Sequence, residues 1–228
     1  MSILSPAENA QHFSRRDRWA TFDCYGTLID WDGGIRRELA RLFGEDRADE
    51  QLDRYHEIEP TLQIGGERSY RDVLAGTMLE LGAPKGEEGA LADALPSWQP
   101  FPEVRVALEE ARSRGWKLAI LSNTDRDFIE ASMMQIGVPF ELAIVASEIG
   151  SYKPGHRHWL RFFEETDASR EAHVHVAQSH FHDIVPANDL GLRTIWINRL
   201  SEHREPPPTR ELPDLADLPT ALDELVAA

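Results

Sequence analysis

From residue 103 onward the sequence alternates between amphipathic helices and short apolar strands, and this alternation constrains the fold more than any other feature. The helical stretches carry apolar residues about 3.6 positions apart, and several end at a glycine, which favours a helix C-terminus. Such alternation predicts parallel strand pairing in an open, doubly wound α/β sheet. The predicted strands are 19–22, 117–121, 142–145, 173–177 and 194–197, and the accompanying helices are 103–114, 128–136, 156–165 and 184–190.

Residues 31–100 interrupt this pattern, because they show helical periodicity and no convincing strand. Ser69 is a suitable N-cap and Gly82 a suitable C-cap for the third of four predicted helices. We therefore predict an α/β core formed by residues 1–30 and 101–228, with an all-helical insertion after the first strand. The predicted helices of the insertion are 35–43, 50–62, 70–81 and 87–95.

The composition argues against several classes of protein. The chain of 228 residues has 24 basic and 40 acidic side chains, giving a net charge of −16. This charge disfavours nucleic-acid binding and docking on anionic membranes. A single cysteine excludes an internal disulfide. No apolar run approaches the roughly 20 residues of a membrane span, and the polar N-terminus lacks a signal-peptide core. We expect a cytoplasmic protein, either a monomer or a homodimer, with a small anionic substrate.

Chemically capable side chains gather where the predicted strands end. In doubly wound sheets, ligands bind beyond the carboxyl ends of the strands. Four of the strands lead into such side chains, and this coincidence predicts a functional site at that edge of the sheet. The side chains are Asp23, Tyr25 and Thr27 after the first strand, Ser122 and Asn123 after the next, Lys153 after the third, and Gln178, Ser179 and Asp183 after the fourth.

These segments resemble the four ordered motifs of the haloacid dehalogenase superfamily. The first motif is matched by Thr21-Phe22-Asp23-Cys24-Tyr25-Gly26-Thr27-Leu28, the second by Leu121-Ser122-Asn123, the third by Tyr152-Lys153-Pro154, and Gln178 to Asp183 stands in the place of the fourth. The resemblance implies a Rossmann-like core with a mobile helical cap. Phosphatases of the superfamily usually carry a second Asp two residues after the nucleophile, where this chain has Tyr25. Tyrosine there resembles the (S)-2-haloacid dehalogenase branch, whose halide leaving group needs no proton.

The resemblance also implies the role of each residue. Asp23 would attack the halogen-bearing carbon of a short 2-haloalkanoic acid and form an ester, which water then hydrolyses. Lys153 would offset the repulsion between Asp23 and Asp183, and Asp183 would position the water. Substrate contacts would come from Tyr25, Thr27, Ser122, Asn123, Gln178, Ser179 and His180, and from Arg54 on a cap helix, where the dehalogenases carry an arginine for the carboxylate and the halide.

Three residues depart from the dehalogenase pattern and leave alternatives open. Gln178 replaces a serine of the dehalogenases and an acid of the magnesium phosphatases, Trp159 replaces a tyrosine, and His180 replaces an asparagine. We expect no required metal or other cofactor. The first alternative is a Mg²⁺-dependent phosphatase of a small phosphate ester, with the ion held by Asp23, the Tyr25 carbonyl and Asp183. The second is a catalytically weak homologue that serves in binding.

Overall fold

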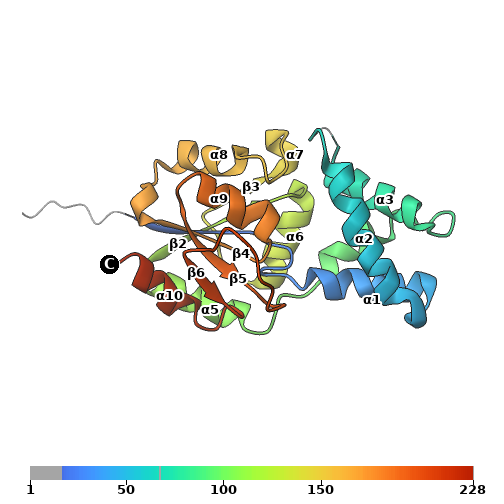
Figure 1. Cartoon of the computed structure of the whole chain (residues 1–228), viewed down its shortest axis with the longest axis horizontal. Coiled ribbons are helices and arrows are strands. Elements are labelled where there is room, and N and C mark those ends of the chain that lie inside the picture. Colours follow the sequence, from blue (N-terminus) through green and yellow to red (C-terminus); the bar gives the residue numbers. More distant parts are fainter. Residues whose placement is uncertain (1–16, 67, 228) are drawn as a thin grey trace, which may run out of the picture.

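The computed structural model of the chain describes residues 17–66 and 68–227. Within this part the core is a six-stranded parallel sheet in the order β3-β2-β1-β4-β5-β6 (Figure 1). This arrangement confirms the predicted fold class. Residues 1–16 lie outside the described residues, and so does the N-terminus on which the expectation of no signal peptide rests. The strands are β1 Arg18–Phe22, β2 Trp116–Ser122, β3 Leu142–Val145, β4 His173–Ala177, β5 Arg193–Ile197 and β6 Arg210–Leu212.

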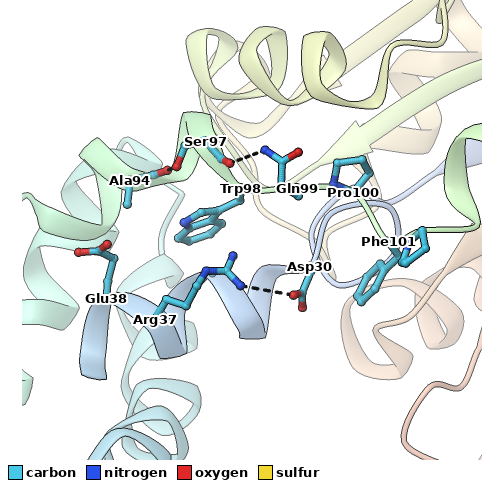
Figure 2. A pocket seen from close by; sticks show the side chains of 11 residues that line it. Asp30, Arg37, Glu38, Ala94, Ser97, Trp98, Gln99, Pro100 and Phe101 are labelled. Carbon is cyan, nitrogen blue, oxygen red and sulfur yellow. Dashed lines mark hydrogen bonds and ion pairs between the residues drawn. The ribbon is translucent and has the colours of Figure 1, made fainter. Parts of the chain in front are cut away.

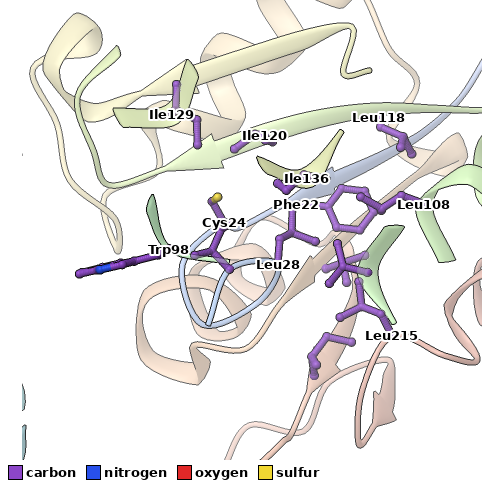
Figure 3. Close-up of a cluster of buried hydrophobic side chains, with 14 of the residues drawn as sticks. Phe22, Cys24, Leu28, Trp98, Leu108, Leu118, Ile120, Ile129, Ile136 and Leu215 are labelled. Carbon is purple, nitrogen blue, oxygen red and sulfur yellow. The ribbon is translucent and has the colours of Figure 1, made fainter. Parts of the chain in front are cut away.

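Helices cover both faces of the sheet and bury alternate residues of each strand. On one face, Phe22 of β1 and Val176 of β4 join a large apolar cluster with α5, α6 and α10 (Figure 3). On the other face, Trp19 packs with Trp159 and Phe162 of α8. This two-residue alternation is the period expected of a strand. The core helices are α5 Val104–Ser113, α6 Arg126–Ile136, α7 Ala146–Ile149, α8 Arg157–Thr166, α9 Val185–Asp189 and α10 Leu218–Leu225.

A helical segment, residues 31–100, follows β1 and lies beside the sheet; we call it the cap (Figure 1). The third predicted helix has the expected bounds and ends, because Ser69 Oγ accepts a hydrogen bond from Asp72 N and Gly82 adopts a left-handed conformation. The division of the chain into two domains at these bounds stays a prediction. The cap helices are α1 Trp31–Phe43, α2 Ala48–Gln63, α3 Tyr70–Leu81 and α4 Ala90–Ala94.

The two linkers between cap and core run side by side. Ile29 pairs with Pro100 in an antiparallel bridge, and Asp30 N donates to Gln99 O at 3.0 Å. Beside them, α1 approaches Trp98 closely, since a Cβ atom on Gly34 would come within 2.4 Å of the Trp98 ring. Figure 2 shows the pocket that lies here and the ion pair between Arg37 and Asp30, two of the residues that line it. Both connections therefore pass through one narrow hinge.

The structure adds elements that the sequence patterns did not indicate. Strand β6 pairs with β5 although two of its three residues are exposed and charged. A π-helical turn over His180–Ile184 precedes α9, where a single helix was predicted from residue 184. No helix in the described part of the chain is both long enough and apolar enough to span a membrane.

Candidate active site

A cleft of about 490 Å³ lies between the cap and the loops at the carboxyl ends of the strands. Both parts form its walls, so a small molecule bound there contacts cap and core together. The core contributes Asp23, Tyr25, Ser122, Asn123, Lys153, Gln178, Ser179, His182, Asp183 and Arg199, and the cap contributes Trp31, Asp32, His56, Glu59, Pro60, Gln63 and Tyr70.

Lys153 stands between two buried carboxylates at the floor of the cleft. Its Nζ donates to Asp23 Oδ1 at 2.8 Å, to Asp183 Oδ1 at 2.6 Å and to Leu121 O at 2.9 Å. Burial disfavours the ammonium ion, but the two carboxylates together raise the pKa of Lys153. Burial also raises the pKa of Asp23 and Asp183, and the lysine opposes both rises. The lysine therefore favours the ionised form of two neighbouring carboxyls, against the burial that favours their protonation.

Thr27 holds the second oxygen of Asp23. Its hydroxyl donates to Asp23 Oδ2 at 2.9 Å and accepts from Gln178 N at 2.8 Å. The loop between them turns at Gly26, whose φ of +83° is strained for other residues and whose added Cβ would lie 3.1 Å from Gln178 Oε1. Each Asp23 oxygen thus has one donor, and the carboxylate is oriented before any ligand binds.

Asn123 joins the second and third sequence motifs. Its Oδ1 accepts from Lys153 N at 2.6 Å, and its Nδ2 donates to Lys153 O at 3.0 Å. The same Nδ2 donates to Gln63 Oε1 of the cap at 3.1 Å. The neighbouring Ser122 lines the cleft, and its buried Oγ has no hydrogen-bond partner within the described chain. Ser122 is therefore available as a donor to a ligand.

His175 is a site residue that sequence reasoning missed. Burial lowers its pKa to about 3, so the ring is neutral and carries one N–H. Nε2 lies 3.0 Å from Asp183 Oδ1, and Nδ1 lies 2.8 Å from Thr21 Oγ1. With the proton on Nε2, His175 donates to Asp183 and accepts from Thr21. Trp159, expected to replace a substrate-facing tyrosine, is fully buried and packs edge-on against His175 at 5.1 Å between ring centroids.

One face of α2 forms the cap side of the cleft, and the sequence did not mark it. His56, Glu59, Pro60 and Gln63 follow the i, i+3, i+4, i+7 spacing of a single helix face. Burial raises the pKa of Glu59 to about 7, against the hydrogen bonds from Gln63 and Tyr70 and the charge of His56. A buried, easily protonated carboxyl therefore faces the catalytic floor from the cap.

Comparisons with known proteins agree with this arrangement. A model of the haloacid dehalogenase-like hydrolase family matches residues 18–190. The chain belongs to the haloacid dehalogenase-like hydrolases. The hydrolase is 30% identical over 189 residues to an (S)-2-haloacid dehalogenase of Pseudomonas sp. (strain YL), covering 78% of this chain and 81% of that protein. It is also 26% identical over 152 residues to a phosphoserine phosphatase of Thermus thermophilus, covering 64% and 59% of the two chains.

Solved structures show the same fold. The L-2-haloacid dehalogenase from Xanthobacter autotrophicus with chloropropionic acid covalently bound superimposes on this hydrolase with a TM-score of 0.77. The identity is 21%, and the superposition covers 90% of this chain and 98% of that chain. Likeness at this identity establishes the architecture of the hydrolase, while its substrate has to be argued from the site.

Two of the predicted substrate contacts of the hydrolase lie outside the residues that line the cleft. Arg54 was expected to face the substrate, but its guanidinium donates to Gln51 Oε1 at 3.3 Å and to Glu80 O at 3.4 Å, outside the cleft. It precedes His56 by two positions, about 200° around the helix, and so lies on another face. His180 Nε2 donates to Pro206 O at 2.8 Å and also lies outside the cleft lining. The neighbouring His182 lines the cleft instead.

Five of the remaining predicted contacts of the hydrolase line the cleft, namely Tyr25, Ser122, Asn123, Gln178 and Ser179, whereas the buried Thr27 reaches it only through its bond to Asp23. Tyr25 stacks on Tyr70 of the cap with 6.4 Å between ring centroids, and its hydroxyl is 3.0 Å from Ser132 Oγ. Ser179 Oγ accepts from His182 N at 3.2 Å and so caps the turn before Asp183. Gln178 lines the cleft beside Gly26.

Some of the oxygen atoms at the floor of the cleft are suited to bind a magnesium ion. Asp183 Oδ2 is buried and has no partner among the described residues, and carboxylate oxygens are ligands that Mg²⁺ prefers. Asp23, Asp183 and the Tyr25 carbonyl would hold the ion, and it would polarise a phosphoryl oxygen. In the described ranges no cluster of three or more His, Cys, Asp or Glu side chains is suited to a metal.

Proposed function

We propose that the protein releases halide from a short 2-haloalkanoic acid, with Asp23 as the covalent nucleophile. The observation that carries this proposal is the pairing of an oriented Asp23 with a poor proton donor two residues later. Burial raises the pKa of Tyr25 well above its usual value, and its hydroxyl is engaged with Ser132. A leaving alkoxide needs a proton, whereas a halide leaves without one.

The first half of the reaction forms an ester. A carboxylate oxygen of Asp23 attacks C2 of the substrate from the side opposite the halogen. The new C–O bond forms as the carbon–halogen bond breaks, and the halide leaves with the bonding electron pair. Ser122 would donate to the substrate carboxylate, because its hydroxyl lines the cleft and has no partner in the described chain, whereas Asn123 Nδ2 already donates to Gln63 and Lys153.

The second half hydrolyses the ester. Water attacks the carbonyl carbon of the Asp23 ester and transfers a proton to Asp183, whose Oδ2 is free of other partners in the described chain. The Lys153 ammonium, 2.8 Å from Asp23 Oδ1, stabilises the negative charge that develops on that carboxyl. As the tetrahedral intermediate collapses, the bond to the substrate oxygen breaks and that oxygen takes the proton held by Asp183. The 2-hydroxy acid departs, and the Asp23 carboxylate is regenerated when the second proton of the water passes to solvent. The relatives that are named as 2-haloacid dehalogenases support this proposal.

Halide release from (S)-2-chloropropionate tests the proposed function directly. We expect turnover at a rate unchanged, within about twofold, by an excess of EDTA, because neither half-reaction uses a metal. Free chloride is measured with and without the chelator. Release that vanishes in EDTA would contradict the metal-free mechanism.

Magnesium-dependent phosphatase activity is the second candidate, favoured by the unpartnered Asp183 Oδ2 and by the phosphatase among the relatives. Small phosphate esters are therefore assayed in parallel, with Mg²⁺ and with EDTA. Turnover of an ester only with Mg²⁺, and of no haloacid, would replace the proposed function with this one. Absence of turnover with both classes would favour a binding homologue.

Replacing Arg54 by Gln is expected to leave KM for (S)-2-chloropropionate within about twofold of the wild-type value, since Arg54 is not among the residues that line the cleft. The guanidinium contacts Gln51 and Glu80 rather than the cleft. Steady-state kinetics at saturating and limiting substrate measure the effect. A rise in KM of tenfold or more (about 1.4 kcal/mol) would restore Arg54 to the substrate site.

A further inference from the structure

The carboxyl of Glu59 is buried in the cleft without a cationic partner. Glu59 is 4% exposed, and its Oε1 accepts a hydrogen bond from Gln63 Nε2 at 2.5 Å. Among the described residues, no lysine or arginine lowers its pKa. A buried carboxylate is costly unless it is paired, and the group avoids that cost by holding a proton. Glu59 therefore has no structural partner that requires its charge.

The position of Glu59 joins it to the catalytic floor. Gln63 accepts from Asn123 Nδ2 through Oε1 while it donates to Glu59 through Nε2. Asn123 in turn binds the backbone of Lys153 on both sides. One chain of side-chain contacts thus runs from Glu59 across the cleft to the residue that holds Asp23.

The cleft offers few cations to an anionic substrate. Lys153 is engaged by two carboxylates, and Arg199 is paired with Glu103 at 2.7 Å. Several titratable and charged groups line the cleft with Glu59 or interact with it electrostatically. They are Tyr55 and His56 from α2, Tyr70 from α3, Asp30 and Asp32 from the start of α1, Tyr152 and Lys153 from the loop after α7, Asp23, Tyr25, His182 and Asp183 from the floor, and Arg199 and Glu202 from the loop after β5.

We propose that Glu59, as a neutral carboxylic acid, is the hydrogen-bond donor of the cap to the carboxylate of the substrate. This inference rests on the proposed function in taking the substrate to be a small carboxylate. Oε1 already accepts from Gln63, which leaves Oε2 to carry and donate the proton, with the Tyr70 hydroxyl as the other group that hydrogen-bonds this carboxyl. A bond of the type O–H···O⁻ is short and strong. The ionised form of Glu59 repels the same substrate, so Glu59 selects for carboxylates by its protonation state.

The surroundings of Glu59 supply the neutral form near neutral pH. Burial raises its pKa to about 7, so the acid form predominates below that pH and the carboxylate above it. His56 also titrates, because its hydrogen bond to Asp32 raises its pKa. Replacing Glu59 leaves the His56–Asp32 pair in place and removes only the smaller contribution that the charge of Glu59 makes to the pKa of His56.

Binding of propionate, a carboxylate with no leaving group, tests this inference independently of turnover. The dissociation constant is measured by calorimetry from about pH 6 to about pH 8.5 for the wild type, for Glu59→Gln and for the control Glu57→Gln, an exposed residue of the same helix. We expect the wild type and the control to lose about tenfold or more in affinity over this range. Glu59→Gln, which keeps a neutral donor, binds as the wild type does at low pH and varies less than about threefold.

Each other outcome overturns the inference. Wild-type affinity that is constant or increases with pH would show that Glu59 does not bind the substrate as an acid. The inference also fails if Glu59→Gln keeps the full pH dependence or if propionate does not bind at about pH 6. If propionate binds with the expected pH dependence but the wild type releases no halide from (S)-2-chloropropionate, the proposed function is refuted. The assignment of Glu59 as a hydrogen-bond donor then stands.

Discussion

Halide release is expected to fall by on the order of 10⁴-fold or more when Asp23 is replaced by Asn, because the neutral amide is a poor nucleophile. Asp23 has both oxygens held by donors, Lys153 Nζ and the Thr27 hydroxyl. The loss therefore reflects chemistry rather than a misplaced side chain. Chloride release in single-turnover and steady-state experiments measures it. Asp93→Asn, at an exposed position of the cap, is the matched control.

The same residue gives a second, isotopic readout. We expect a single turnover of the wild type in water labelled with a heavy oxygen isotope to place labelled oxygen in the Asp23 carboxyl. The reason is that water attacks the ester carbonyl and not C2 of the substrate. Mass spectrometry of the peptide that contains Asp23 detects it. Label found only in the hydroxy acid would mean that water displaces the halide directly. Activity of Asp23→Asn within about tenfold of the wild type (about 1.4 kcal/mol) would exclude covalent catalysis through this residue.

Replacing Lys153 by Met is expected to destabilise the fold by about 3–5 kcal/mol, because it leaves buried carboxylates without their cation. Activity falls as well, by on the order of 10²–10³-fold, since Asp23 then tends to hold a proton. Urea unfolding gives the stability change, and chloride release gives the activity. A variant that unfolds like the wild type would show that the buried charges are compensated elsewhere.

The stability loss in Lys153→Met has a defined pH dependence. Burial already raises the pKa of Asp23 and Asp183, and without the lysine both rise further. Between the unfolded and folded pKa values the folded protein binds more protons, so its free energy of unfolding decreases as pH rises. We expect a smaller loss at about pH 5 than at about pH 8. Adding Asp183→Asn restores part of the stability at the higher pH and none of the activity.

The elements of the core could be predicted from the sequence because its strands are apolar and several of its helices end at a glycine. Strands 142–145 and 173–177 and helix 70–81 have the predicted bounds. Strand β6 has no such pattern, since Arg210 and Glu211 are exposed and only pairing with β5 makes the segment a strand. Local sequence cannot report a pairing partner that lies elsewhere in the chain.

The floor and the cap differ in how far the sequence could predict them. Motif residues follow strands of one parallel sheet, so topology alone brings Asp23, Lys153 and Asp183 together. The cap has no comparable rule, because periodicity gives the spacing of α2 but not the direction in which each face points. Arg54 and Glu59 are both charged residues of that helix, yet only Glu59 lines the cleft. Tertiary packing, which no window of sequence contains, decides between them.

The bridge between the two linkers bears on how the substrate range of such a protein can change. The cap leaves the core after Ile29 and returns at Pro100, and these two residues are bridged. One uninterrupted stretch of gene thus encodes the cap side of the cleft, while Asp23, Lys153 and Asp183 are encoded outside it. Exchange of the segment between these two residues replaces the cap side and leaves the sequence of the nucleophile loop unchanged. Libraries confined to this stretch therefore sample new substrates while the reaction chemistry is inherited unchanged.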